Sequence, residues 1–370
     1  MMQGECAVIV FGSPSRYVQG PGALAGLGRE LARMGGNVAL LVDPVMFERY
    51  GETIRASARE SGLEVTFLTF GGECTGPEID RLQGGLAQSP AIVCAVGGGK
   101  CIDAGKALAH RLGARVVTVP GIASTDAPTS HNYVMYDADH RMLEVGKLPR
   151  NPDLVLVDTT VIAQAPKALF LAGIGDAIGK VHEVNCCASA GGKNIFGGRS
   201  ALTAVALANA CHDIIIKDAE AALAALDRHQ PDAALERVVE ATVLMSGLAF
   251  ESGGLSVAHS MTRGLTALAP WAGTMHGLQI AYANVVQMHA QGAPEAEIDA
   301  FAEFCRGIGL PVTLAELGGR KAGPDEIARI VEGTMTSPHI GHLPQPIGAG
   351  GLIASVTWVE DRYGVASDAA

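Results

Sequence analysis

The sequence predicts an α/β domain with a doubly wound parallel sheet over residues 1–160, and an all-α domain over residues 161–370. Three observations support this. Short apolar runs alternate with helical patterns in the first part, strand signals end near residue 160, and long Ala- and Leu-rich windows follow. At 370 residues, the chain also exceeds the size at which a single hydrophobic core stops growing.

The predicted strands are nearly continuous apolar runs, which is typical of strands that are buried on both faces of a parallel sheet. Helical windows such as GALAGLGRELARM separate them, and this alternation favours right-handed crossovers and a Rossmann-like sheet. We expect strands at 6–11, 38–43, 64–70, 91–96, 115–120 and 154–158.

The remaining residues carry helical periodicity, with Gly and Pro at the joins, as in HQPD and APWAG. No strand signal interrupts them. We expect helices over 166–190, 200–226, 231–250, 252–268, 275–291, 294–308, 324–334 and 349–363.

Composition disfavours several classes of protein. A formal net charge of −11 opposes binding to nucleic acid and to anionic membranes. No stretch approaches the roughly 20 apolar residues of a membrane helix, and the N-terminus does not resemble a secretion signal. The eight cysteines include no CxxC pair, which favours reduced, buried thiols. We therefore expect a cytoplasmic protein without nucleic-acid or membrane partners.

The motif GGGKCID (97–103) follows a predicted strand and opens the next helix. Glycines at this place let a phosphate approach the N–H groups of a helix N-terminus, and Lys100 adds a positive charge. The alternative is a tight turn without a ligand.

Asp43, at the end of VALLVD, fits two roles equally. It binds ribose hydroxyls and repels a 2′-phosphate, favouring NAD over NADP, or it caps the helix that begins at Pro44.

Two further sets of residues suggest a substrate site. The polar segment VPGIASTDAPTSHNYVMYD (119–137) follows a strand, and Asp126 within it suits either substrate hydroxyls or an Asx-turn. Asp176, His259 and His276 come from three helical segments. A carboxylate and two histidines form a catalytic zinc set that leaves a fourth position open. With 11 histidines in the chain, a structural role for each is the alternative.

Together these segments resemble the glycerol dehydrogenases of the iron-containing (group III) alcohol dehydrogenase superfamily. The resemblance rests on GGGKCIDAGKA, VPGIASTDAPTS, LPRNPDLVLVDTTVIAQAP, LAGIGDAIGK, ESGGLSVAHSMTRGLTAL and TMHGLQIAYANVVQ, in this order. It implies a dehydroquinate synthase-like fold, an active site in the cleft between the domains, and a homo-oligomer, often an octamer. The implied reaction is zinc-dependent, NAD-linked oxidation of glycerol or another vicinal diol to a hydroxyketone.

The resemblance also assigns roles to individual residues. Asp176, His259 and His276 match zinc ligands at the substrate site, and Asp126 matches a carboxylate that contacts the polyol. Positions associated with NAD are Asp43, Gly98, Gly99, Lys100, Asp103, Ser124, Ser130, Asn132 and Tyr136.

Departures from the family pattern leave alternatives open. Lys180 stands where iron-type members carry a histidine, which favours zinc over iron, and Gly121 stands where glycerol dehydrogenases usually have a threonine. The pair Gly179–Lys180 also resembles glycerol-1-phosphate dehydrogenases, which act on a phosphorylated polyol. A lyase related to dehydroquinate synthase or a non-catalytic NAD-binding module is less favoured.

Overall fold

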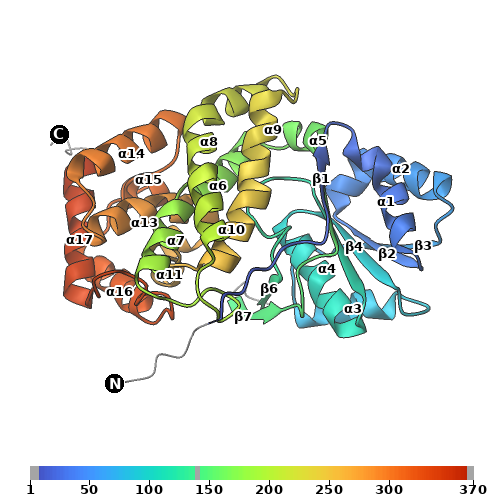
Figure 1. The fold of residues 1–370 in the computed structure, drawn as a ribbon, viewed down its shortest axis with the longest axis horizontal. Coiled ribbons are helices and arrows are strands. Elements are labelled where there is room, and N and C mark those ends of the chain that lie inside the picture. Colours follow the sequence, from blue (N-terminus) through green and yellow to red (C-terminus); the bar gives the residue numbers. More distant parts are fainter. Residues whose placement is uncertain (1–7, 138–141, 365–370) are drawn as a thin grey trace. The chain divides into compact units, whose positions relative to one another are not determined.

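The computed structural model describes residues 8–137 and 142–364 (Figure 1). The chain forms two compact units, and each consists of more than one segment. Unit 1 comprises Met1–Phe11, Leu171–Glu220 and Leu248–Ala370, and unit 2 comprises Gly12–Phe170 and Ala221–Gly247. The sequence predicts a single division near residue 160, whereas here the helical segment 221–247 groups with the sheet. The prediction that residues 1–160 bind NAD and residues 161–370 bind the metal and the substrate stays a prediction.

Unit 2 contains the predicted doubly wound parallel sheet. Its strand order is β1-β8-β5-β4-β2-β3, and all five pairings are parallel. Every residue of β2, β4 and β8 is buried, as the continuous apolar runs predict. The strands are β1 (Tyr17–Gly20), β2 (Val38–Val42), β3 (Val65–Thr69), β4 (Ile92–Gly97), β5 (Arg115–Pro120) and β8 (Leu154–Asp158).

Alternate residues of a strand point to opposite sides of the sheet, so a strand that is apolar at every position gives the sheet two apolar faces. Helices cover both of these faces. Leu40 and Cys94 belong to one apolar cluster, together with Leu27 of α1 and Ile54 of α2. Ala39, Leu41 and Val93, which alternate with them along the strands, belong to a second cluster, formed with α3 and α4. Figure 1 shows α1 and α2 on one side of the strands and α3 and α4 on the other. The helices of this unit are η1 (Ala23–Gly26), α1 (Leu27–Met34), α2 (Pro44–Glu60), α3 (Gly76–Gly84), α4 (Gly99–Leu112), α5 (Thr159–Ala163), α9 (Ala233–Glu240) and the π-helix η2 (Ala241–Met245).

The prediction of a first strand over 6–11 is wrong for residues 8–11, the part of this range that the structure describes. Residues 6 and 7 lie outside the described part, and beyond them only Ile9 forms an isolated bridge, to Arg199. The carbonyl of Val10 accepts a hydrogen bond from Asn194 Nδ2 at 2.8 Å, so a loop satisfies this backbone instead of the sheet. The sheet begins at Tyr17–Gly20, which the pattern missed because an edge strand does not need two apolar faces.

The sequence also missed an antiparallel hairpin formed by β6 (Asn132–Tyr136) and β7 (Met142–Lys147). β6 lies in the polar segment after β5, and no residue of either strand is fully buried. The apolar pattern that identifies the buried strands is therefore absent from the hairpin.

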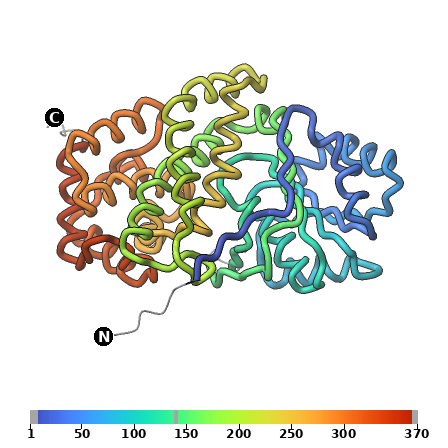
Figure 2. Tube along the Cα trace, in the orientation of Figure 1, coloured from blue at the N-terminus to red at the C-terminus, as the bar shows by residue number. Residues whose placement is uncertain are grey.

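The second half of the chain is helical, as predicted, and α13–α17 lie together in the trace (Figure 2). α13 is the most buried of them, with Ile280, Tyr282 and Val286 fully enclosed. The helices are α6 (Lys167–Ile178), α7 (Lys180–Ser189), α8 (Leu202–Asp227), α10 (Ser246–Gly253), α11 (Val257–Leu265), α12 (Ala269–Ala272), α13 (His276–Ala290), α14 (Glu295–Ile308), α15 (Leu314–Gly318), α16 (Pro324–Met335) and α17 (Ala349–Tyr363).

Two expectations from composition can be compared with this structure. Among the described residues, no helix is both long and apolar enough to cross a membrane. The seven cysteines that the structure describes are free thiols, and all of them are buried. The prediction of reduced, buried cysteines is thus confirmed for this part of the chain.

Candidate active site

Unit 1 brings the three predicted metal ligands together. Asp176 Oδ1 lies 3.6 Å from His259 Nε2 and 3.8 Å from His276 Nε2. All three donor atoms lie within 4.8 Å of one another, and no second group of this kind occurs among residues 8–137 and 142–364. Two ligands about 2.1 Å from a tetrahedral zinc ion lie about 3.4 Å apart. The donor set therefore fits a single metal ion.

Glycines next to two of these ligands explain how their helices approach so closely. Gly175 precedes Asp176 in α6, and Gly277 follows His276 in α13. A Cβ atom at Gly277 would lie 1.7 Å from the carbonyl oxygen of Ala172, and one at Gly175 would lie 2.4 Å from the oxygen of Gly277. The backbones of α6 and α13 are thus in contact, which no larger residue would allow.

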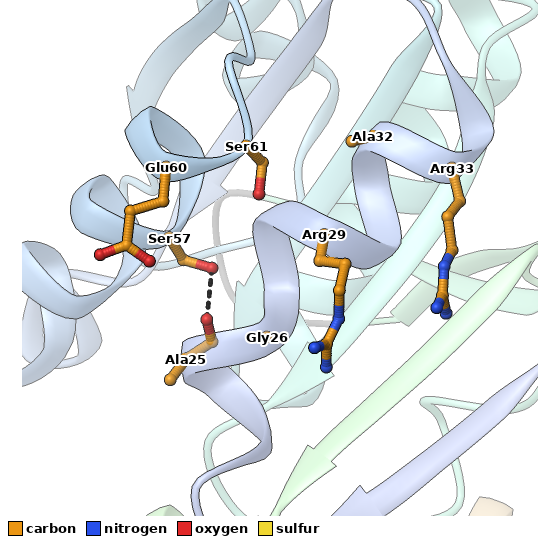
Figure 3. Close-up of a pocket in the computed structure, with 8 residues that line it drawn as sticks. All are labelled: Ala25, Gly26, Arg29, Ala32, Arg33, Ser57, Glu60 and Ser61. Atoms are coloured by element: carbon orange, nitrogen blue, oxygen red, sulfur yellow. Dashed lines mark hydrogen bonds between the residues drawn. The ribbon is translucent and has the colours of Figure 1, made fainter.

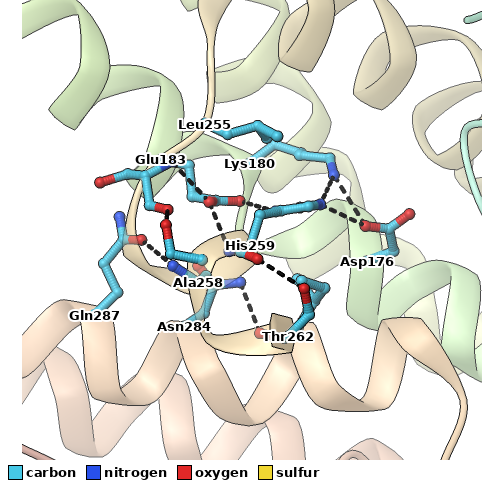
Figure 4. A network of polar contacts seen from close by, with 12 residues as sticks. Asp176, Lys180, Glu183, Leu255, Ala258, His259, Thr262, Asn284 and Gln287 are labelled. Carbon is cyan, nitrogen blue, oxygen red and sulfur yellow. Dashed lines mark hydrogen bonds and ion pairs between the residues drawn. The ribbon is translucent and has the colours of Figure 1, made fainter. Parts of the chain in front are cut away.

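Glu183 of α7 orients the His259 ring (Figure 4). The carboxylate is fully buried, and it accepts hydrogen bonds from His259 Nδ1 at 2.5 Å and from the backbone N–H groups of Ser256 and His259. Burial alone would raise the pKa of Glu183, but the charge and hydrogen bonds of His259 lower it to about 2. With its hydrogen on Nδ1, a neutral His259 presents the lone pair of Nε2 to Lys180 Nζ, 3.2 Å away.

The sequence prediction missed Glu183. The available signal was its position seven residues after Asp176, which is about two helical turns and would place both side chains on one face. The chain in fact breaks at Gly179 between α6 and α7. That break cannot be read from the periodicity alone.

Lys180, also of α7, contacts the same group of side chains. Its Nζ lies 2.9 Å from Asp176 Oδ1 and 3.2 Å from His259 Nε2. Burial would raise the pKa of Asp176, but the positive charge of Lys180 and the neighbouring histidines hold it well below its usual value. Asp176 is thus a buried carboxylate in its anionic form, as a metal ligand requires.

Asp126 lies in unit 2, on the segment after β5, and is almost fully buried. Its Oδ2 accepts a hydrogen bond from Ser246 Oγ at 2.9 Å. An Asx-turn would need a donor N–H two residues further along, where Pro128 has none. Ser246 directly follows the π-helix η2, and such helices are frequent at functional sites. The carboxylate is therefore held from a second element, and its predicted contact with the polyol stays a prediction.

The turn between β4 and α4 also lies in unit 2. Gly98 is the N-cap of α4, and Gly99 is its first residue. A Cβ atom at Gly97 would lie 2.9 Å from the Cβ of Asp43, so Asp43 lies beside this turn. Its Oδ1 accepts a hydrogen bond from Val45 N at 2.9 Å, which shows the capping role. A ribose contact for the same carboxylate remains a prediction.

Gly121, where the resemblance associates a threonine, directly follows β5 and packs against Met46. A Cβ atom there would lie 2.5 Å from Met46 Sδ, so a threonine at this position would require the Met46 side chain to move.

Lys100 and Asp103, both predicted to contact NAD, have protein partners here. Lys100 Nζ lies 2.5 Å from Glu73 Oε2 and 5.4 Å from the centre of the Tyr136 ring. Asp103 accepts a hydrogen bond from Val134 N at 3.2 Å, which ties β6 to α4. Burial raises the pKa of Asp103 to about 6, against the opposing charge of Lys106. Their contacts with NAD stay predictions.

The other predicted cofactor positions lie between β5 and the end of β6. Ser130 is buried, and its Oγ accepts a hydrogen bond from Asn132 N at 2.9 Å. Asn132 Oδ1 is buried without a hydrogen-bond partner among the described residues. Burial raises the pKa of Tyr136 to about 12, and Ser124 is half-buried in the turn after β5. These residues share one region of unit 2, and their contacts with NAD remain predictions.

A separate cavity of about 610 Å³ lies against α1 and α2 (Figure 3). Ser57 Oγ donates a hydrogen bond to the Ala25 carbonyl at 2.6 Å and so ties α2 to η1. None of the predicted site residues lines this cavity. Its lining residues are Ala25, Gly26, Arg29, Ala32, Arg33, Ser57, Glu60 and Ser61.

Comparisons with known proteins agree with this fold. Residues 14–159 match the iron-containing alcohol dehydrogenase family. A glycerol dehydrogenase of Escherichia coli O6:H1 is 36% identical over 354 residues, which cover 95% of this chain and 96% of that protein. The chain therefore belongs to the iron-containing alcohol dehydrogenase family, as the sequence motifs predict.

Solved structures give the same result for the fold. A probable glycerol dehydrogenase from Sinorhizobium meliloti 1021 is similar with a TM-score of 0.89 and 35% identity, covering 96% of this chain and 99% of that one. The glycerol dehydrogenase of Schizosaccharomyces pombe is similar with a TM-score of 0.91 and 30% identity, covering 98% and 95%. The predicted combination of a parallel α/β sheet and a helical remainder is confirmed.

Proposed function

We propose that this protein is a zinc-dependent, NAD-linked dehydrogenase that oxidises glycerol or another vicinal diol to a hydroxyketone. The observation that carries the proposal is the convergence of Asp176, His259 and His276 at distances that fit one ion. Similarity to glycerol dehydrogenases over 95% of the chain supports a polyol as the substrate. A set of two nitrogen donors and one oxygen donor is a common zinc site.

Asp176 Oδ1, His259 Nε2 and His276 Nε2 are the atoms that would hold the metal. When bound, a divalent ion supplies Lewis-acid chemistry that makes a substrate hydroxyl easier to deprotonate. Three protein donors leave a position for a substrate oxygen. Glu183 keeps the hydrogen of His259 on Nδ1, so Nε2 has the lone pair that would bind the metal. This buried carboxylate thus sets the direction of one ligand.

NAD supplies the hydride acceptor, and unit 2 offers the residues to bind it. We assign the pyrophosphate to the N-terminus of α4 at Gly98 and Gly99, because unpaired N–H groups there favour anions. We assign the ribose to Asp43, whose carboxylate would repel the 2′-phosphate of NADP. We assign to Asp126, whose carboxylate accepts a hydrogen bond from Ser246, a contact with a hydroxyl of the diol.

A substrate screen tests this function. We expect NADH formation from NAD with glycerol or propane-1,2-diol, its loss after treatment with a chelator, and its return with Zn²⁺. Propane-1,3-diol is the matched control, since it has two hydroxyls that are not vicinal, and it should react more slowly. Activity with glycerol 1-phosphate alone, and with none of the free diols, would instead favour the phosphorylated-polyol alternative. The comparisons with glycerol dehydrogenases do not favour that alternative.

Replacing Ser246 with alanine should reduce both stability and substrate binding. The change removes a hydrogen bond to a buried carboxylate, so we expect about 2 kcal/mol less stability in urea unfolding and a KM for the polyol raised about 10-fold. Thr242→Val is the control, because Thr242 lies on the preceding π-helix η2 and its Oγ1 donates to the carbonyls of Val238 and Val239 in α9 instead of to Asp126. Equal effects of the two substitutions on KM would argue against a positioned Asp126.

Homo-oligomeric assembly, including an octamer, and a cytoplasmic location follow from the family resemblance. Both belong to the proposal.

A further inference from the structure

Lys180 is a buried cation in contact with two of the proposed metal donors. Only 1% of its side chain is exposed, and the side chain of Asp176 beside it is 3% exposed. A charge removed from water in this way needs an opposite charge as its partner. Figure 4 shows the ammonium pointing at both Asp176 and His259, with distances of 2.9 Å to Oδ1 and 3.2 Å to Nε2.

These contacts and metal binding use the same lone pairs. His259 has one hydrogen and one lone pair on its ring nitrogens when neutral, and Glu183 accepts the hydrogen on Nδ1. The lone pair of Nε2 therefore either accepts an N–H of Lys180 or binds a metal ion. Two cations at the same carboxylate oxygen would also repel each other. The observed position of Lys180 and a bound metal thus exclude one another.

The structure also offers the ammonium a second partner. Lys180 Nζ lies 5.3 Å from the centre of the Phe250 ring, which is itself buried. An aromatic face attracts a cation at this distance, and a lysine has a flexible stem of four carbons. Lys180 can therefore move away from the donor atoms without losing every favourable contact.

We propose that Lys180 is an internal counter-ion of the metal site, which stabilises the metal-free protein and must be displaced when the metal binds. Its charge offsets one of the two buried carboxylates, Asp176 and Glu183, that otherwise attract the metal. The side chain thus lowers the affinity for the metal and makes the metal exchangeable. This inference rests on the proposed function only in requiring that the three donors bind a divalent ion.

Lys180→Met tests the inference, because methionine is similar in length and has no charge. Two quantities are measured: the melting temperature in excess chelator and in saturating Zn²⁺, and the dissociation constant of Zn²⁺ in competition with a chelating dye. We expect the metal-free variant to melt roughly 5 °C lower than the unsubstituted protein. We expect it to bind Zn²⁺ about 10- to 100-fold more tightly.

Lys106→Met is the matched control, since Lys106 is also fully buried but bonds to carbonyls in unit 2, those of Ala127 and Asn132. It should lower the stability of both forms and leave the zinc dissociation constant unchanged. Lys180→Gln, which is neutral but keeps a donor, should also bind zinc more tightly, and it serves if the methionine variant does not fold without metal.

Three results distinguish the possibilities. Tighter zinc binding by a neutral Lys180 variant, with no such change in Lys106→Met, supports the counter-ion. If the unsubstituted protein binds zinc and the Lys180 variants bind it equally or more weakly, Lys180 is not a counter-ion of the metal site. The proposed function then stays intact. Absence of zinc binding by the unsubstituted protein and both Lys180 variants overturns the metal centre, and this inference with it.

Discussion

His259→Ala is expected to weaken zinc binding by at least about 100-fold and to lower polyol turnover by at least about 1000-fold. The substitution removes one of three donors and leaves the buried Glu183 carboxylate without its hydrogen bond from Nδ1. The buried charge keeps only its two backbone hydrogen bonds, and this weaker compensation adds a cost in stability to the loss of the ligand. Metal content by elemental mass spectrometry and the rate of NADH formation measure the two effects.

His289→Ala is the control for this substitution. His289 lies on α13, the helix that also carries His276, and it bonds to Ser355 and stacks on Trp358 with ring centres 4.4 Å apart. Its loss should reduce stability while the protein keeps its zinc. Full metal content and full turnover in His259→Ala would refute the role given to this residue.

Gly277→Ala is expected to have the largest effect on stability, at about 3 kcal/mol or more. The new methyl group would lie 1.7 Å from the backbone oxygen of Ala172, and backbone cannot rotate aside as a side chain can. α6 and α13 must separate, which also moves Asp176 away from His276. Zinc affinity should therefore fall together with the stability measured by urea unfolding in the presence of a chelator.

Gly273→Ala provides the comparison, because no atom lies within 4 Å of a Cβ placed there and the backbone has an ordinary φ of −86°. It should leave both stability and zinc affinity close to their original values. A Gly277→Ala protein as stable as Gly273→Ala would show that the contact between the two helices does not position the site.

Much of the fold follows from local sequence patterns. The predicted helical window 275–291 corresponds to α13 (His276–Ala290), and the apolar run 154–158 corresponds to β8. These patterns arise because a buried strand or helix face must be apolar at every position that it hides. The run 6–11 is equally apolar, but its described part, residues 8–11, forms no strand of the sheet, since pairing depends on which distant segment lies beside it. β6 and β7 escaped prediction because their residues are not fully buried.

Less of the site could be read from the residues alone. Asp176, His259 and His276 are far apart in sequence, and only the family motifs singled them out from other histidines and carboxylates. Glu183 and Ser246 were not predicted, because their roles depend on a hydrogen bond to a residue in another element. Asp43 illustrates a residue whose pattern fits two roles, and here the capping role is seen directly.

Titration of Zn²⁺ into the metal-stripped protein, with NADH formation from glycerol followed at each addition, addresses the metal centre itself. We expect activity to rise linearly and to reach its plateau at one zinc ion per chain, because one group of three donors is present among the described residues. Full turnover by protein that contains no divalent metal would contradict a reaction centred on Asp176, His259 and His276.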